Sequence, residues 1–424
     1  MKKFLLTLLI LLGCVGTGYI GYKLAINQVS SPVTSYHTPS KNDRPVNDNT
    51  SVSGASVAST DNTESETDNS PETEISFSAC GDNLINSYIY SQAKMRGKKG
   101  KYDFSYCYRS VADFFKETDL NWMNQETLVS NKIEPSTYPR FCSPGAVAKA
   151  LYKINFRVFN ISTNHTYDQG AKGLSTTEEF WKSMPDDTMA VGLEKKKNNT
   201  KIKIKKINGI KFAFLSYTYG TNGLPTPDDS KTRVIYLNET EIIKKQVKQA
   251  NRKADVVIVS CHWGNEDKHE ITDAQRSLAK DLTGWGADLI IGTHPHVVQD
   301  AEWVKNKGHK AFCAYSLGNF ISGQSKADNL IGAVLSLKFS FTRDEDDDYL
   351  KVKIKDPKLI PTVTDYRPGH QKIKVVWLKD YKKKSADTHG VRSAGGNKFN
   401  YDYIFDVLKK TVNRKYLDLP KKKD

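Results

Sequence analysis

Two histidines separated by one residue, His294 and His296, are the side chains of this sequence best placed for chemistry. They lie in the segment Gly292-Thr293-His294-Pro295-His296, directly after the apolar run at 287–291. Where a strand stops and turns, alternate side chains can converge on one point, and neutral imidazole is a common ligand for divalent metals. The pattern predicts a metal clamp, although a solvated turn would explain an isolated pair of this kind equally well.

Ligand-type residues also follow four other strand-like runs. They are Asp82 after 75–80, Glu126 after 119–123, Asn164 and His165 after 158–163, and His262 after 256–261. In an α/β sheet, ligands bind outside the carboxyl ends of the strands, so residues far apart in the sequence become neighbours there. Chance placement at five strand ends is improbable, and the sequence therefore predicts one shared metal site.

Six motifs, in this order, resemble those of the CapA (PgsA-like) capsule-synthesis family, a branch of the calcineurin-like metallophosphoesterase superfamily. The motifs are Gly81-Asp82, Asn124-Gln125-Glu126, Asn164-His165-Thr166-Tyr167-Asp168-Gln169-Gly170, His262-Trp263-Gly264-Asn265-Glu266, Gly292 to His296, and Ser316-Leu317-Gly318-Asn319-Phe320. The resemblance covers residues 75–325. It implies an α/β fold, a four-layer α/β/β/α sandwich of the metallophosphoesterase type.

The resemblance also implies roles for the motif residues around two divalent ions. Asp82 and His296 would serve the first ion, Glu126 would bridge, and Asn164, His262 and His294 would serve the second. His165 would be the general acid, and Asp168 would orient its loop or its ring. Glu266 and Asn319 would support the ligands without binding the ions themselves. The alternatives are an exposed carboxylate at Glu266 and a structural turn residue at Asn319.

Two departures from the superfamily pattern bear on catalysis. Leu84 stands where the first motif usually has a second imidazole, and Glu126 stands where an aspartate is usual. With fewer ligands at the first ion, we expect one tightly held ion (Mn2+, Fe2+ or Zn2+) and a second, weaker one. Two hypotheses remain: a metal-dependent hydrolase of phosphoester-type bonds, and a non-catalytic scaffold that handles polymer.

Alternating strands and helices must position these residues. A capping-box-like start at 238–241 predicts a helix to about Lys253, and Thr272 begins another that ends near 284–286. Each is followed by an apolar strand, at 256 and at 289, which indicates a sheet covered on both faces. A hairpin of strands 331–341 and 350–354 around acidic residues 344–348, and a helix at 400–412, form an extension at 326–424 that we expect to pack on the sandwich.

The N-terminal 74 residues do not resemble a folded domain. Lys2-Lys3 precede an apolar stretch, and 1–27 is predicted to be a signal-anchor that places the folded part on the extracellular side of the cell membrane. A lipoprotein signal with cleavage before Cys14 is the competing interpretation. Residues 28–74 are nearly all polar, with a single aromatic residue, which predicts a disordered tether.

The charge of the chain predicts anionic partners. The formal net charge is +15, although the predicted tether is acidic. A basic outward surface attracts polyanions, so we expect the membrane, an anionic envelope polymer such as poly-γ-glutamate, and membrane synthase subunits as partners. No nucleic-acid-binding module is recognisable, which argues against nucleic acid.

The six cysteines form no obvious disulfide framework. Strand alternation predicts that Cys261 points away from the face that carries His262, and Cys313 lies in an apolar strand. A disulfide between Cys107 and Cys142 is left open, as is their presence as free thiols.

Overall fold

The computed structural model describes residues 73–195, 201–227, 230–343, 350–393 and 398–422. The predicted membrane segment, all but the last two residues of the predicted tether, and the acidic turn at 344–348 lie outside the described residues. Within the described ranges, none of the helices combines the length and the apolar character that a membrane crossing requires.

The first of two sheets joins strands from both ends of the described chain. β1 to β4 and β11 pair in parallel, whereas β12, β13 and β14 form an antiparallel meander on the other side of β1. The C-terminal strands therefore continue the sheet that holds the first motif. In spatial order the strands are β14 (Gln371–Trp377), β13 (Leu350–Arg367), β12 (Ile331–Arg343), β1 (Thr73–Asn83), β2 (Leu120–Asn124), β3 (Phe156–Asn160) and β4 (Met189–Val191), with β11 (Asn319–Ile321) paired to β1.

The second sheet has a parallel centre and antiparallel edges. β6, β7, β8 and β10 pair in parallel, and β5 and β9 run antiparallel to their neighbours. In spatial order the strands are β5 (Lys203–Ile207), β6 (Ile210–Thr218), β7 (Val256–His262), β8 (Leu289–Thr293), β10 (His309–Ala314) and β9 (Ala301–Asn306).

The two sheets face each other across a shared core. Phe212 of β6 contacts Phe339 of β12, with ring centroids 5.3 Å apart. Along β7, Val256 and Ile258 belong to this core, while Val257 and Cys261 belong to a second core under the outer helices. The two-residue period of the strand thus separates Cys261 from His262, as expected. A strand buried on both faces has a continuous apolar sequence, and β7 and β8 could therefore be predicted from the sequence.

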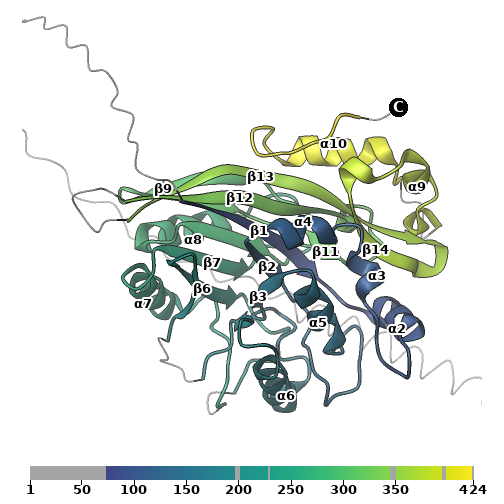
Figure 1. Ribbon diagram of the computed structural model, residues 1–424, viewed down its shortest axis with the longest axis horizontal. Coiled ribbons are helices and arrows are strands. Elements are labelled where there is room, and N and C mark those ends of the chain that lie inside the picture. Colours follow the sequence, from purple (N-terminus) through teal and green to yellow (C-terminus); the bar gives the residue numbers. More distant parts are fainter. Residues whose placement is uncertain (1–72, 196–200, 228–229, 344–349, 394–397, 423–424) are drawn as a thin grey trace, which may run out of the picture. The chain divides into compact units, whose positions relative to one another are not determined.

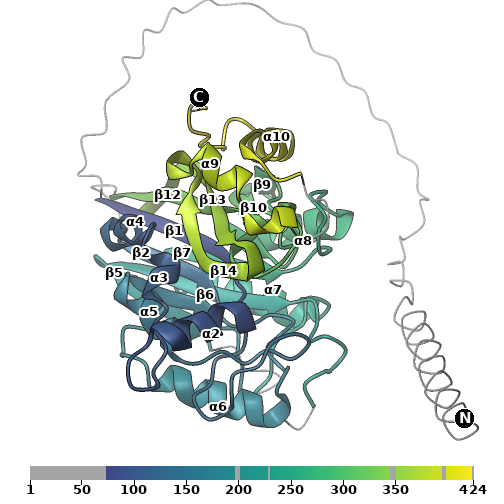
Figure 2. The same cartoon turned by 90° about the vertical axis from the view of Figure 1, so that its right-hand side faces the viewer.

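Helices cover the outer faces of the sheets, and the predicted α/β class is confirmed (Figures 1 and 2). α7 and α8 pack on the second sheet, and α4 packs on the first through Phe115, whose ring centroid lies 4.6 Å from that of Phe156. The helices are α2 (Ser87–Arg96), α3 (Ser105–Tyr108), α4 (Ala112–Glu117), α5 (Ala146–Lys153), α6 (Gly170–Lys182), α7 (Thr240–Asn251), α8 (Asp273–Trp285), α9 (Lys383–Asp387) and α10 (Tyr401–Thr411). Short 3-10 turns are η1 (Asp328–Leu330), η2 (Pro368–His370), η3 (Leu378–Asp380) and η4 (Gly390–Ser393).

The predicted helix starts differ in how they are capped. At α8, Thr272 and Gln275 form the reciprocal capping box, and Gly286 ends the helix in the left-handed conformation. At α7 the box is absent, because the Glu239 carboxylate accepts a hydrogen bond from the backbone of Tyr236 instead. β13 also runs to Arg367, much further than the predicted strand at 350–354.

The two cysteines for which a disulfide was left open are both free thiols. Cys107 is a buried residue of α3 and accepts a long hydrogen bond from Arg96, whereas Cys142 donates to the carbonyl of Ile133. They therefore have separate environments, and burial raises the pKa of each thiol.

A bulge at the end of β1 sets the direction of the first motif residue. Cys80 pairs with Met123 and Asp82 pairs with Asn124, so Gly81 is an extra residue in β1. Such a bulge reverses the side-chain alternation, and it turns Asp82 towards the second sheet. Only glycine fits at position 81, because a Cβ there would collide with the carbonyl oxygen of Gly318 in the segment leading to β11.

Candidate metal centre

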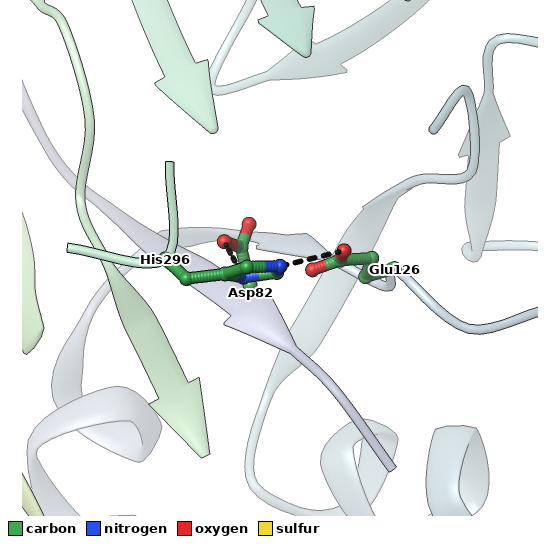
Figure 3. Close-up of side chains that lie close together, drawn as sticks. All are labelled: Asp82, Glu126 and His296. Atoms are coloured by element: carbon green, nitrogen blue, oxygen red, sulfur yellow. Dashed lines mark hydrogen bonds and ion pairs between the residues drawn. The ribbon is translucent and has the colours of Figure 1, made fainter. Parts of the chain in front are cut away.

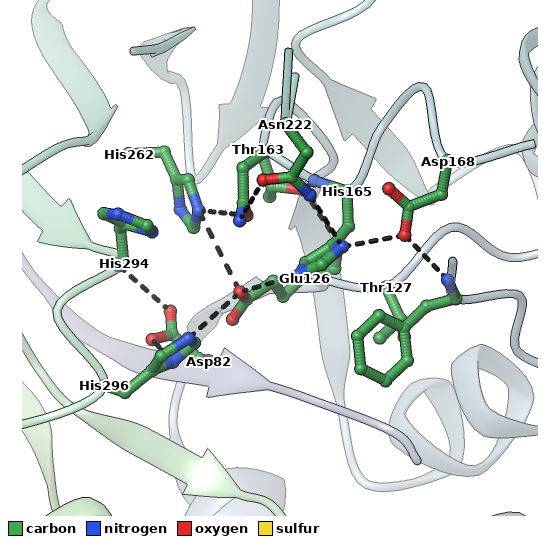
Figure 4. Close-up of polar contacts among 12 residues, drawn as sticks. Asp82, Glu126, Thr127, Thr163, His165, Asp168, Asn222, His262, His294 and His296 are labelled. Atoms are coloured by element: carbon green, nitrogen blue, oxygen red, sulfur yellow. Dashed lines mark hydrogen bonds and ion pairs between the residues drawn. The ribbon is translucent and has the colours of Figure 1, made fainter. Parts of the chain in front are cut away.

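The carboxyl ends of β1, β2, β3, β7 and β8 bring the motif residues to one place between the sheets (Figure 4). Long-range contacts join groups more than two hundred positions apart, such as the backbone N–H of His294, which donates to Asp82 Oδ1 at 3.4 Å. The gathering follows from the parallel strands, whose carboxyl ends share one edge of a sheet.

Glu126 occupies the middle of this cluster. Its Oε1 lies 3.6 Å from His296 Nε2 and 4.0 Å from both His262 Nε2 and His165 Nε2. The side chain is fully buried, and neither carboxylate oxygen has a hydrogen-bond partner among the described residues. Buried carboxylates normally have partners, so the cluster is built around an unsatisfied pair of acceptor atoms.

Asp82 and His296 form one half of the cluster (Figure 3). His296 Nδ1 lies 3.0 Å from Asp82 Oδ2 and 3.1 Å from Asn319 Oδ1, so Nδ1–H donates on that side and Nε2 faces Glu126. One ligand atom from each of Asp82, Glu126 and His296 can be chosen so that all lie within 4.8 Å of one another. These three buried residues can hold a metal ion, and they are the set expected for the weaker first ion.

The residues expected for the second ion form the other half. His262 Nε2 lies 2.9 Å from Asn164 Oδ1, and the opposite ring nitrogen lies 2.9 Å from Thr293 Oγ1. The His294 ring lies 4.8 Å from that of His262, and its buried Nδ1 has no hydrogen-bond partner among the described residues. His262 links this set to Glu126, since its Nε2 lies 4.0 Å from Glu126 Oε1.

Burial governs the charges of the central groups. Burial, and then the nearby Asp82 carboxylate, raises the pKa of Glu126 well above its usual range. Burial and the neighbouring imidazoles lower the pKa values of His262 and His294, so both rings are neutral and keep the lone pairs that a metal needs. Burial opposes charge on His296, but the Glu126 carboxylate and the hydrogen bond to Asp82 raise its pKa to about 10.

His165 and Asp168 form a dyad at the edge of the cluster. His165 Nδ1 lies 2.7 Å from Asp168 Oδ2, which also accepts the backbone N–H of Phe141 at 2.7 Å. The Phe141 ring packs edge-on against the imidazole. The dyad holds the ring so that Nε2 points at Glu126, the arrangement of a carboxylate-oriented acid or base.

The two histidines after β8 are held in unusual backbone conformations. His294 has φ of +99° and His296 has φ of +61°. Such residues cost about 1–3 kcal/mol each and gather at functional sites, because the surrounding structure must over-determine them. Gly292 before them is required by packing, since a Cβ there would collide with the carbonyl oxygen of Tyr315.

Glu266 and Asn319, the two expected supporting residues, differ. Asn319 Oδ1 contacts His296 Nδ1, and its amide nitrogen donates to the carbonyl of Asn329 at 2.9 Å. Glu266 is exposed, which matches the alternative of an exposed carboxylate. The structure therefore places only Asn319 against a candidate ligand.

Residues to which the sequence assigned no role also contact the cluster, and Asn124, Tyr219 and Asn222 are examples. Asn124 donates to Asp82 Oδ1 at 2.7 Å, and its place in the second motif was the available signal. The Tyr219 ring lies 4.4 Å from the His294 ring, and Asn222 lies between Asn164 and His165, at 3.1 and 3.2 Å. Tyr219 and Asn222 both follow β6, a sixth apolar strand with polar residues at its carboxyl end. That position in the sequence was the signal that could have predicted them.

The donor set fits a divalent cation. Two carboxylates, neutral imidazoles and an amide oxygen are ligands of borderline and hard divalent ions such as Zn2+, Fe2+ and Mn2+. The unpartnered atoms are Glu126 Oε1 and Oε2 and His294 Nδ1, and each can satisfy itself by coordination. Leu84 is buried and contributes no ligand.

Comparison with known proteins agrees with the motifs. Residues 76–324 match the family model described as "Bacterial capsule synthesis protein PGA_cap". The chain is 29% identical over 253 residues to the PGA biosynthesis protein CapA of Bacillus subtilis (strain 168), covering 59% of this chain and 64% of that protein. It is 30% identical over 234 residues to the capsule biosynthesis protein CapA of Bacillus anthracis, covering 53% and 55%. The match spans less than two thirds of either relative.

Solved structures with some similarity include two nucleotidases. The NAD nucleotidase of Haemophilus influenzae aligns with a TM-score of 0.40 at 14% identity, covering 82% of this chain and 64% of that one. A 5'-nucleotidase precursor from Thermus thermophilus aligns with a TM-score of 0.40 at 12% identity, covering 80% and 58%.

Proposed function

Since the chain belongs to the bacterial capsule synthesis protein PGA_cap family, we propose that it acts in the synthesis or export of an anionic envelope polymer such as poly-γ-glutamate, using a divalent-metal hydrolase site of the phosphoesterase type. The two relatives named for capsule biosynthesis support the process. The metal centre supports the chemistry.

One observation carries the proposal of a metal site. Glu126 is buried among three imidazoles and Asp82, yet neither carboxylate oxygen has a hydrogen-bond partner among the described residues. A buried carboxylate without a partner costs several kcal/mol unless a proton or a cation compensates it. A structural role alone would not explain such an arrangement, whereas a bridging ligand would.

The residues that would hold the ions are Asp82, Glu126 and His296 on one side and Glu126, Asn164, His262 and His294 on the other. When bound, a divalent ion in such a site polarises a phosphoryl oxygen and activates water. We propose Mn2+, Fe2+ or Zn2+, with one ion held tightly and a second more weakly. Asn124 and Asn319 position Asp82 and His296 through the hydrogen bonds described above.

His165 would carry the proton transfer. Its Nδ1 is held by Asp168, and its Nε2 faces the centre, 4.0 Å from Glu126. From this position Nε2 would donate a proton to the leaving oxygen, while the Asp168 carboxylate stabilises the charged ring.

Metal analysis of the purified chain tests the proposal, followed by a phosphodiester hydrolysis screen with Mn2+, Zn2+ and Fe2+. We expect a tightly held ion in the chain as isolated and metal-dependent hydrolysis that the Glu126→Gln variant lacks. Absence of any bound metal, before and after addition of the three ions, would contradict the proposal.

A second candidate function is a scaffold subunit that binds polymer and membrane synthase subunits without catalysis. The observation that favours it is Leu84, which is buried where the superfamily usually has an imidazole. The same experiment separates the two, because a scaffold would retain metal without hydrolysing any phosphodiester.

We also propose that residues 1–27 anchor the chain in the cell membrane and that the folded part lies on the extracellular side. Protease added to intact protoplasts should then release the folded part from the membrane fraction. Survival of the full-length chain would contradict this placement. A Cys14→Ser variant distinguishes the anchor from a lipoprotein, since only a lipoprotein precursor would accumulate uncleaved.

A further inference from the structure

A groove of about 890 Å³ shares none of the proposed metal ligands, but one of its lining residues, Tyr108, donates to Asn83, the neighbour of Asp82. One wall comes from α2 to α4 and includes Lys94, Tyr108 and Arg109, and the opposite wall comes from α5 and includes Lys149 and Lys153. The segment 130–135 closes one side. A volume of this size accommodates several residues of an extended chain.

The groove is basic. Its lining contains six Lys or Arg residues and three Asp or Glu residues. The pair of Asp113 and Lys116, 3.0 Å apart, removes one charge of each sign, which leaves five Lys or Arg residues against Asp103 and Glu134. The field in the groove therefore favours an anionic occupant.

Three of its lysines, Lys101, Lys149 and Lys153, are exposed, and their ammonium groups form no ion pair with a described residue. Lys153 is the least free of them, because hydrogen bonds from Ser105 and then the charges of Arg96 and Lys153 lower the pKa of Asp103. Lysine is a compact point charge, whereas arginine offers the fork that suits bidentate phosphate recognition. Lysines distributed along two walls match single negative charges spaced along a chain better than clustered phosphates.

The loop from 127 to 145 connects the groove with the metal centre. Ser130, Ile133 and Pro144 line the groove. In the same loop, the backbone of Phe141 binds Asp168 and its ring packs on His165. A chain lying in the groove would therefore be held along the loop that also positions the proton-donating dyad.

We propose that this groove is an accessory binding site for an extended polycarboxylate, which it holds next to the metal centre. The assignment rests on the proposed function for the identity of the polymer, but the site itself is separate from the catalytic residues. Lys101, Lys149 and Lys153 contact the carboxylates, and the Tyr102 ring, against which Lys94 lies at 4.7 Å, forms an apolar side of the groove.

Binding of poly-γ-glutamate to the full-length chain tests the proposal, measured by calorimetry at low ionic strength. The triple variant Lys101→Gln, Lys149→Gln, Lys153→Gln should bind about tenfold more weakly, as expected for the loss of three solvent-exposed ion pairs. The matched control is Lys211→Gln, Lys248→Gln, Lys280→Gln, three exposed lysines on β6, α7 and α8, which removes the same charge and should bind like the wild type.

The outcomes separate this site from the proposed function. Equal weakening in both triple variants, or no binding by the wild type, would overturn the groove assignment. Binding of inorganic polyphosphate to the groove in preference to poly-γ-glutamate would overturn the polycarboxylate assignment. A Glu126→Gln variant should bind the polymer normally even though its metal centre is damaged, and loss of binding there would place the polymer at the metal centre instead.

Discussion

The metal centre and the basic groove both contact the loop from 127 to 145, and they use charge in opposite ways. At the centre, Glu126 is fully buried and lies within 4.0 Å of three imidazoles, and its carboxylate oxygens have no hydrogen-bond partner among the described residues. In the groove, the lysine ammonium groups are exposed to solvent. Charges in a low-dielectric interior interact strongly and cannot be left uncompensated, whereas exposed charges are screened and contribute little individually.

The difference predicts how each region responds to substitution. At the centre, one side chain should decide function, because both expected ligand sets depend on Glu126. In the groove, function should emerge only from the sum of several side chains. The following predictions would sharpen or break this contrast, from the largest expected effect to the smallest.

Glu126→Gln should have the largest effect. The amide keeps the shape but loses the charge that both expected ligand sets share, so hydrolysis should disappear and metal affinity should fall at least about 100-fold. Calorimetric titration with metal measures the affinity, and a phosphodiester assay measures the hydrolysis. The control is Glu270→Gln, which removes an exposed carboxylate that is not among the expected ligands, and this variant should bind metal normally. Normal metal content in the Glu126 variant would show that no single side chain of the metal centre decides metal binding.

His165→Ala should separate metal binding from chemistry. Its proposed role is proton donation, so hydrolysis should fall about 10²- to 10⁴-fold while the metal content stays unchanged. Asp168→Asn should have a smaller effect of the same kind, because it orients the ring without supplying the proton. Parallel loss of metal and activity in the His165 variant would instead make His165 a ligand.

Gly292→Ala tests whether the metal centre tolerates a change in backbone packing. A Cβ would collide with the Tyr315 carbonyl, and the free energy of unfolding should decrease by about 3 kcal/mol. Gly220→Ala is the matched control, since a Cβ there would meet nothing within 4 Å, and it should change stability by less than about 0.5 kcal/mol. Urea unfolding of both variants gives the comparison.

Tyr108→Phe addresses a residue that belongs to both regions. Its ring lines the groove, while its hydroxyl donates to Asn83 at 2.8 Å, and Asn83 donates in turn to Gln125 at 2.6 Å. These two partners are the neighbours of Asp82 and Glu126. Loss of the hydroxyl should cost about 1–2 kcal/mol of stability, because Asn83 Oδ1 is left buried without its donor. Polymer binding should be unchanged; a clear decrease would show that the two regions are not separate.

Lys149→Gln alone should have the smallest effect. One solvent-exposed ion pair is worth about 0.5 kcal/mol, so polymer affinity should decrease only about two- to threefold. A loss as large as that of the triple variant would show that the groove, like the centre, depends on a single dominant contact.

The sequence alone determined the α/β class, the strand ends at which ligands gather and the family. Buried parallel strands are continuous apolar runs, and each is followed at once by its motif, so this information is local in the sequence. The sequence also predicted the opposite orientations of Cys261 and His262, since side chains alternate along a strand with a period of two.

Only the tertiary structure decided how the motif residues meet. The packing of the two sheets decides which set of ligand atoms converges most closely. It also decides the bulge that turns Asp82 inward and the contacts of Tyr219 and Asn222, because the two sheets come from distant parts of the chain. The exposure of Glu266 and the separate environments of Cys107 and Cys142 are decided in the same way. The groove depends on the spacing between α4 and α5, which is set by packing on the first sheet and has no signature in the order of the residues.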